Sequence, residues 1–382
     1  MNKDNLNQIF TEYIDKFEFV NDAEHMEYYK WQICREYPVL MKKALEASAE
    51  DLPIALYEVK KCTKNVIDSY TQPFMGLVEL AKKEPETVRK MLIDLYADDG
   101  GDLSVLMKLI SDFFEQHNVL LNKYFPDSFL YKQNSHSVSA MLFLNDPEHH
   151  YMYKAVQCQS FAESIEYYND WGTGDNIKLD VFYKMCDEVI EEIKKCPELL
   201  DTDKRRFDGR LDILYKGEMH PDMEKHILLF DIIYCCNVYD LFNKISYNKL
   251  SSKEKKEHLV KQSIAERLRQ AYERALADSQ KLEEAYSCFV GLLSNIGKIK
   301  HKKYGEGKVC GVSRDYIVVE FQEKKTQISL PMCISNGIIM VDNPEYDEKA
   351  ELYRDVLKRY NTIPQALEYA MRELKPYEEF LD

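Results

Sequence analysis

The sequence predicts a mainly α protein with a multi-helical N-terminal region, a small β-barrel near the C-terminus and two closing helices. Two observations support this fold class. Apolar residues recur every three or four positions through residues 1–297, which is typical of helices that pack on a core. After Gly297 the pattern changes to short alternating runs rich in β-branched and aromatic residues, which is typical of strands.

Length and composition limit the class of protein. The chain has 382 residues, of which 66 are acidic and 51 basic, so its net charge is −15. Such a length predicts two or three domains. The 13 glycines and 12 prolines exclude collagen-like and wholly disordered classes. No apolar run approaches the roughly 20 residues of a membrane span, and the polar start shows no secretion signal, so we expect no membrane contact.

The ten cysteines are scattered and form no C-x-x-C motif or Cys–His spacing suited to zinc. We therefore expect them to be small apolar core residues. Free cysteines in a chain without a signal favour a reducing cytoplasm. The sequence predicts no bound metal and no cofactor.

The first expected domain covers residues 1–170. Apolar spacing predicts helices there, with Pro85 in a first turn and the glycine-containing stretch 98–102 as a break between helices. A polar loop at 170–176 leads into a second helical region, 171–297. That region contains a break at Cys196–Pro197 followed by a charged stretch, and a helix within 226–242 that is apolar nearly all round.

The longest helical pattern covers residues 251–296. From 251 to 303 the chain has 12 basic and 7 acidic residues, whereas the whole chain is acidic. We therefore expect a long basic helix beside the strand-rich segment. A solvated helix face remains the simpler interpretation of the same charges.

Residues 298–343 form the strand-rich segment, with expected strands at Lys308–Cys310, Tyr316–Phe321 and Thr326–Leu330. Three to five strands in so short a segment predict a strongly bent, SH3-like barrel. The remaining segment, 344–382, predicts two helices, Tyr346–Tyr360 and Ile363–Leu381.

The strand-rich segment resembles the Tudor-like C-terminal domain of the UvrD/PcrA helicases. The resemblance rests on the motif YGEGKV at 304–309, the run IVVEF at 317–321, a basic hairpin and the NGII segment at 336–339. We expect Gly305 and Gly307 to permit the tight turn that opens the motif. The resemblance implies contact with nucleic acid or RNA polymerase.

Residues 10–165 are similar to the helical region that precedes the ATPase in McrB-type restriction proteins. The stretches that match include PFMGLVELAK at 73–82, EPETVRKM at 84–91 and HSVSAMLFL at 136–144. The chain has no G-x-x-x-x-G-K-[ST] motif for an ATPase. The resemblance therefore implies a defence-associated recognition region that acts with a separate motor.

Catalytic motifs are weak. The sequence shows no nucleophile elbow or H-E-x-x-H, and the adjacent His149 and His150 point about 100° apart on a helix. Asp315 with Glu323–Lys325 has the residue types of a metal-dependent nuclease, but it falls on an expected hairpin. We predict no catalytic or metal-binding residue, although an enzyme of unknown reaction remains an alternative.

The strand-rich segment carries the predicted binding surface, in which aromatic rings stand among basic side chains. We expect a non-catalytic recognition or adaptor protein that contacts nucleic acid, or a nucleic-acid enzyme, through this segment and the adjacent helix. The alternative is a protein-interaction module that docks on a separate ATPase, helicase or polymerase. The predicted binding residues are Lys300, Lys302, Lys303, Tyr304, Lys308, Arg314, Tyr316, Lys324 and Lys325.

Overall fold

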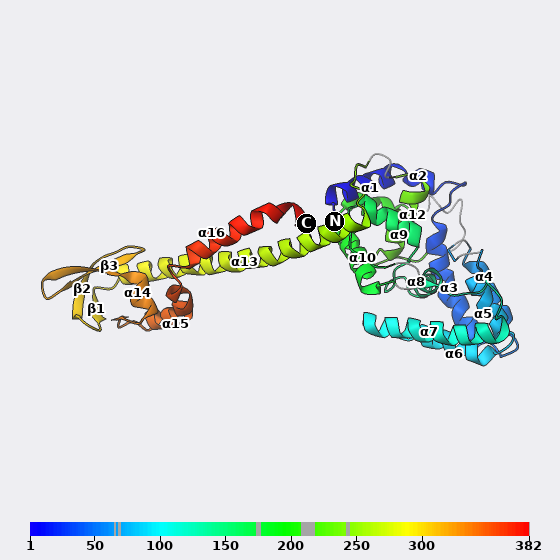
Figure 1. The fold of residues 1–382 in the computed structure, drawn as a ribbon, viewed down its shortest axis with the longest axis horizontal. Coiled ribbons are helices and arrows are strands. Elements are labelled where there is room, and N and C mark those ends of the chain that lie inside the picture. Colours follow the sequence, from blue (N-terminus) through cyan, green and yellow to red (C-terminus); the bar gives the residue numbers. More distant parts are fainter. Residues whose placement is uncertain (65, 68–69, 173–176, 208–217, 242–244, 382) are drawn as a thin grey trace. The chain divides into compact units, whose positions relative to one another are not determined.

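A computed structural model describes residues 1–64, 66–67, 70–172, 177–207, 218–241 and 245–381. Part of the expected loop at 170–176 lies outside these residues. The chain divides into two compact units, residues 1–251 and 252–382, which are described separately (Figure 1). Within the described part of the chain, no helix is both long and apolar enough to cross a membrane.

Unit 1, residues 1–251, is helical throughout its described secondary structure. Pro85 begins a helix, as predicted, and the break at 98–102 separates α6 from α7. Its helices are α1 (Lys3–Asp15), α2 (Phe17–Val20), α3 (Tyr29–Glu46), α4 (Leu52–Cys62), α5 (Pro73–Ala81), α6 (Pro85–Leu95), α7 (Leu103–Tyr124), α8 (Ser135–Asn145), α9 (Ala155–Ser164), α10 (Leu179–Lys194), α11 (Pro197–Lys204) and α12 (His226–Val238).

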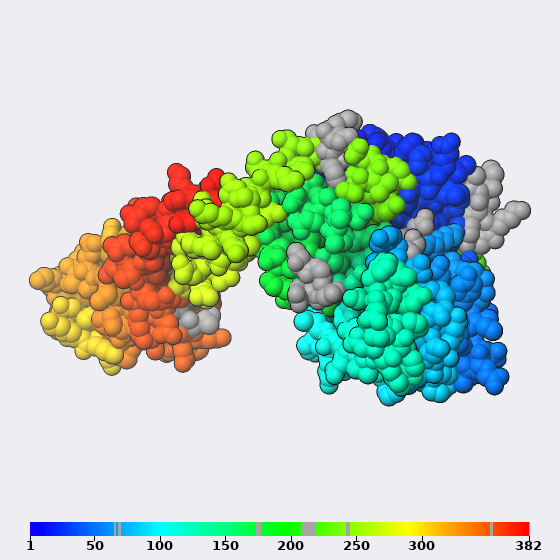
Figure 2. Space-filling model, turned by 45° about the vertical axis from the view of Figure 1, so that its right-hand side comes forward, coloured from blue at the N-terminus to red at the C-terminus, as the bar shows by residue number. Residues whose placement is uncertain are grey.

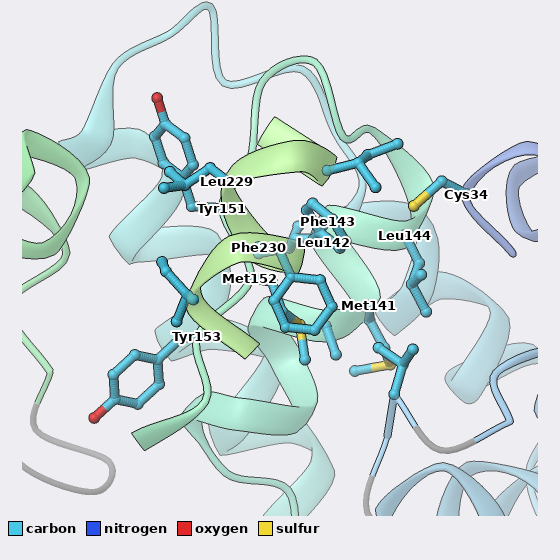
Figure 3. Close-up of a cluster of buried hydrophobic side chains, with 14 of the residues drawn as sticks. Cys34, Met141, Leu142, Phe143, Leu144, Tyr151, Met152, Tyr153, Leu229 and Phe230 are labelled. Carbon is cyan, nitrogen blue, oxygen red and sulfur yellow. The ribbon is translucent and has the colours of Figure 1, made fainter. Parts of the chain in front are cut away.

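Two helices of unit 1, α8 and α12, are buried nearly all round. Phe143 of α8 and Phe230 of α12 meet edge to face, with ring centroids 5.5 Å apart. Figure 3 labels both residues in a cluster of buried hydrophobic side chains. A capping box starts α8: Asn134 accepts from the Ser137 amide, and the Ser137 hydroxyl accepts from the Asn134 amide. Because polar surface is nearly absent from α12, the helix is stable only inside this core.

Unit 2, residues 252–382, contains the predicted small sheet and the two closing helices. Its elements are α13 (Ser252–Ser294), β1 (Lys298–His301), β2 (Gly305–Val312), β3 (Tyr316–Phe321), β4 (Lys324–Ser329), α14 (Leu330–Ser335), β5 (Ile339–Met340), α15 (Pro344–Lys358), α16 (Ile363–Leu374) and the 3-10 helix η1 (Lys375–Phe380). Strand structure thus begins one residue after Gly297, where the periodicity changes.

The five strands form one antiparallel sheet in the order β4-β3-β2-β1-β5. Alternate residues of β3, including Ile317 and Val319, are buried. The register between β2 and β3 shifts between Val309 and Gly311, which marks a β-bulge. One face of the sheet therefore covers a core and the other is open to solvent.

The C-terminal half of α13 packs on this sheet. Tyr286, Phe289 and Leu293 are buried in one cluster with Ile317 and Val319. Helix α16 lies along α13 (Figure 2, red beside yellow-green). The sequence-based division placed 252–297 with the preceding helices, whereas the structure groups it with the sheet, because its apolar stripe is covered by sheet residues.

Candidate functional site

The predicted binding residues all lie in unit 2, and three of them occupy the turn between β1 and β2. His301 shapes this turn, because its Nδ1 accepts hydrogen bonds from the amides of Lys303 (3.0 Å) and Tyr304 (3.2 Å). Gly305 follows with φ of +75°, a conformation that glycine adopts without strain. Lys302 and Lys303 are thereby held exposed at one end of the sheet.

An aromatic cluster supports the same end of the sheet. The Tyr304 ring stacks on the buried His301 ring at 4.6 Å and lies 5.4 Å from the Phe321 ring. Tyr304 is nevertheless 43% exposed, and the Lys303 ammonium stands 5.5 Å from its ring centre. Burial and the Lys303 charge lower the pKa of His301. The arrangement presents a fixed aromatic face beside cations, which is the geometry that stacks a nucleic-acid base.

The open face of the sheet carries a row of charged residues. Strand register aligns Lys298, Lys308, Glu320 and Lys325 across four neighbouring strands, and Lys300 lies two residues along β1 from this row, opposite Glu306. Three of the predicted lysines, at 300, 308 and 325, thus share one face. Two carboxylates on the same face reduce its positive charge.

Gly307 has a different role from the predicted one. It lies within β2, and a Cβ at this position would come within 2.5 Å of Phe321 and Val319 side-chain atoms. The residue is therefore required for close packing of the sheet core, while Gly305 alone has the positive φ that a tight turn needs.

Arg314 and Tyr316 lie at the opposite end of the sheet, next to the β2–β3 turn. Arg314 pairs with Glu283 of α13, and its guanidinium lies 4.9 Å from the Tyr286 ring centre. The structure therefore separates these two residues from the 302–304 turn. Lys324, at the start of β4, lies opposite Phe321 on the same end as that turn.

The charge excess found by sequence counting does not lie on the long helix. Residues 252–294 contain 8 basic and 7 acidic residues, whereas 298–303 contain four lysines and no acid. Several helix cations also pair within α13, as Arg269 does with Glu266 at 2.9 Å. The basic surface is therefore the β1 strand and its turn, because the acids of α13 offset its cations.

Sequence reasoning missed a network of buried charges in unit 1. Asp231 of α12 is 0% exposed and accepts from Lys30 Nζ at 2.5 Å and from Arg206 at 3.1 Å. The Tyr13 hydroxyl also donates to this carboxylate, and so does the Cys235 thiol, whose sulfur lies 3.6 Å from Oδ1. Arg206 Nε also donates to Asp203 Oδ1, at 3.0 Å. The charged stretch after Cys196–Pro197, expected as a break, thus enters the core.

Burial by itself favours the uncharged forms of Lys30 and Asp231. The ion pairs between these groups favour the charged forms instead. Burial, the largest single influence, disfavours the charge of Lys30, but Asp231 together with Cys235, Glu27 and Tyr29 outweighs it, so the Lys30 pKa lies well above its ordinary value. Burial also opposes the Asp231 charge, yet Lys30 and Arg206 lower the Asp231 pKa. The network connects α1, α3 and α12 and is closed off from solvent, so it positions helices and offers no access to a substrate.

A hollow of about 540 Å³ in unit 1 collects acidic residues and two histidines. Its acids already have structural partners: Asp187 accepts from Tyr151 at 2.6 Å, and Glu148 accepts from the amides of Met223 (2.9 Å) and Glu224 (2.7 Å). Throughout the residues that the structure describes, no group of three or more His, Cys, Asp or Glu could hold a metal ion. Asp187 and Glu148 therefore contribute to the local packing around this hollow.

Comparison of the chain with protein-family models, with curated proteins and with solved structures gives no match.

Proposed function

We propose that the protein is a non-catalytic recognition or adaptor protein that contacts nucleic acid through the β1–β2 turn and the open face of its sheet. The observation that carries the proposal is the exposed Tyr304 ring, fixed by His301 and Phe321 among lysines. A rigid ring beside cations stacks a base while the cations contact phosphates. Closure of the sheet into an SH3-like barrel is part of this proposal, and the strand order, with β4 and β5 at its ends, supports it.

Charge distribution restricts where nucleic acid binds. Unit 1 has 29 basic and 44 acidic residues, so it repels phosphates, whereas residues 298–325 have 8 basic and 4 acidic residues. Binding confined to the sheet would involve few phosphates, and we expect moderate affinity with clear salt dependence. The similarity to McrB-type recognition regions supports a role in defence, with a separate motor protein.

The test is binding of a fluorescent single-stranded oligonucleotide at several salt concentrations. Replacing Lys300, Lys302, Lys303 and Lys308 with Glu should abolish retention at physiological salt and lower the slope of log K against log salt by about 3. The control replaces four exposed lysines of unit 1, Lys42, Lys43, Lys61 and Lys83, with Glu and should leave binding unchanged. Absence of salt-dependent binding by the wild-type protein would show that the nucleic-acid proposal is wrong.

A second candidate function is docking on a protein partner, namely a separate ATPase, helicase or polymerase subunit. The observation in its favour is that β4 ends the strand order, so no described strand pairs with its outer edge; if the sheet is not closed into a barrel, a strand of another protein can add there. A partner that co-purifies after nuclease treatment, and is lost when Gln327 on β4 is replaced with Pro, would favour docking. Loss of the partner on nuclease treatment would favour nucleic acid.

A further inference from the structure

A second feature of unit 2 lies beside the sheet, between β5, the end of α14 and α15. It is a hollow of about 500 Å³, which is within the size range of small-molecule sites. Buried apolar side chains, Ile339, Tyr346 and Ala350, form part of its lining. Its polar lining comes from both sides: Lys302 from the β1–β2 turn, Ser335 from α14, and Arg354 and Lys358 from α15.

Two donors in this lining have no partner among the residues that the structure describes. Ser335 is 4% exposed, and its Oγ makes no hydrogen bond to a described residue. The Nε of Arg354 is buried and also makes none. A buried donor without an acceptor destabilises a protein, and most buried polar groups in native structures have one. Both residues line the hollow, so each of these donors lacks an acceptor beside it.

The charged residues of the lining indicate the charge of the missing ligand. The lining contains three cations, Lys302, Arg354 and Lys358, and one carboxylate, Asp347; Lys358 also pairs with the exposed Asp355 at 3.6 Å. These cations are not needed to satisfy the end of α14, because the amides of Gly337 and Ile338 already donate to the carbonyls of Ile334 and Cys333, at 3.2 and 2.8 Å. An anion is thus the complementary ligand.

The backbone brings one cation close to the α14 end. Gly337 has φ of +55°, and a Cβ built on it would lie 4.0 Å from Lys302 Nζ. A guanidinium, two ammonium groups and a hydroxyl together offer donors in several directions, which matches the several acceptor oxygens of a phosphate better than the two of a carboxylate.

We propose that this hollow binds a phosphate group, either inorganic phosphate or the phosphomonoester of a nucleotide. The Arg354 guanidinium and the Ser335 hydroxyl donate to its oxygens, and Lys302 and Lys358 balance its charge. This site goes beyond the proposed nucleic-acid surface, from which it differs in every residue except Lys302.

The test is calorimetric titration of the full chain at low ionic strength with inorganic phosphate, a nucleoside 5′-monophosphate and the matching nucleoside. Both phosphates should bind and the nucleoside should not. Tenfold tighter binding of the monophosphate would place the nucleoside in the hollow, whereas equal binding would identify phosphate alone as the ligand. Binding of neither phosphate would overturn the proposal.

Two variants should weaken phosphate binding without destabilising the fold. Ser335→Ala should weaken phosphate binding about tenfold, as expected for loss of one hydrogen bond to a charged group. The same change should leave the melting temperature of the free protein unchanged or raised, because it removes a donor without a partner. Arg354→Lys, which retains the charge but lacks Nε, should weaken binding by a similar factor.

The control is Lys349→Ala, a change on the same helix at a lysine that pairs with Glu345 at 2.9 Å outside the hollow. Its phosphate affinity should equal that of the wild type. Equal losses in Ser335→Ala, Arg354→Lys and Lys349→Ala would overturn the site. Replacing Lys300, Lys303 and Lys308 with Glu should remove oligonucleotide binding and retain phosphate binding, so failure of one proposal leaves the other standing.

Discussion

The two units use charge in opposite ways. Unit 1 carries the entire net charge of −15, with 44 acidic and 29 basic residues, yet it buries a network of ion pairs around Asp231. Unit 2 has 22 residues of each sign, and the ion pairs in the part of it that the structure describes are at least partly exposed, as with Arg314 and Glu283. Ion pairs therefore lie in the core of unit 1, whereas those of unit 2 lie on its surface.

This difference has an energetic meaning. A buried ion pair contributes little net stability, but removal of one member leaves a charge that neither water nor a partner stabilises. An exposed pair is weak in either case. Both tryptophans, Trp31 and Trp171, are buried in unit 1, so tryptophan fluorescence follows that unit, while circular dichroism follows both.

The largest effect is expected from Asp231→Ala. The change removes the carboxylate that Lys30 and Arg206 share and leaves each with one buried acidic partner, Glu27 and Asp203 respectively, and we expect a loss of about 3–5 kcal/mol in the unfolding free energy of unit 1. Urea unfolding followed by tryptophan fluorescence measures it. Asp201→Ala, at a 72% exposed aspartate, is the control and should change little. Equal effects of the two changes would contradict the importance of buried charge in unit 1.

The next effect depends on pH and concerns Asp222. Burial raises its pKa to about 7, and the Asp203 carboxylate adds to the rise, although the amides of Ile227 and Leu228 oppose it. The folded state therefore holds a proton that the unfolded state loses near pH 4, so this residue makes unit 1 less stable as pH rises from about 4 to 7. The cost levels off above pH 7 at about 4 kcal/mol at most.

Asp222→Asn checks this expectation, because an amide cannot ionise and still accepts one backbone hydrogen bond. The stability of the variant relative to wild type should increase from pH 4 to pH 7 and then stay constant, in urea unfolding followed by fluorescence. A difference that is independent of pH would show that the Asp222 carboxyl has the same pKa in both states.

A smaller effect should separate the core of unit 2 from that of unit 1. Gly307→Ala places a methyl group within 2.5 Å of Phe321 and Val319, and we expect a loss of about 1–3 kcal/mol. In urea unfolding, circular dichroism should show that unit 2 unfolds at a lower urea concentration, while the unfolding curve from tryptophan fluorescence should not change. Gly311→Ala is the matched control in the same strand, because its Cβ meets nothing within 4 Å. Similar losses for both glycines would contradict the packing role of Gly307.

The smallest effect is expected at the exposed pair between Arg314 and Glu283. A double-mutant cycle with Arg314→Ala and Glu283→Ala, measured by circular dichroism, should give a coupling energy below about 1 kcal/mol. A coupling as large as that of a buried pair would remove the contrast between the two units.

Much of the fold was predictable because it depends on local pattern. The helices of unit 1, the start of strands after Gly297 and the two closing helices follow from spacing and turn residues. The grouping of α13 with the sheet was not predictable, since its apolar stripe is consistent with any covering partner. The structure shows that Ile317 and Val319 provide that cover.

The candidate site was predictable in composition but not in arrangement. Sequence reasoning selected Tyr304 and its neighbouring lysines, yet it grouped Arg314 with them, which lies at the opposite end of the sheet. It also missed His301 as the residue that shapes the turn. Asp231 carried a usable signal, because an acidic residue within an apolar helix requires buried partners. The identity of those partners, Lys30 and Arg206, could not be read from local pattern.

The sequence by itself determined the helical and strand periods, the acidic balance and the absence of a G-x-x-x-x-G-K-[ST] motif, because these are properties of composition and of neighbouring residues. Only the tertiary structure decided which charges are buried and which surround the hollow beside β5. Lys30 and Asp231 are 201 positions apart and share no local pattern, yet they meet at 2.5 Å. Contacts at such separations depend on how helices and strands pack, so they become visible only once the chain is folded.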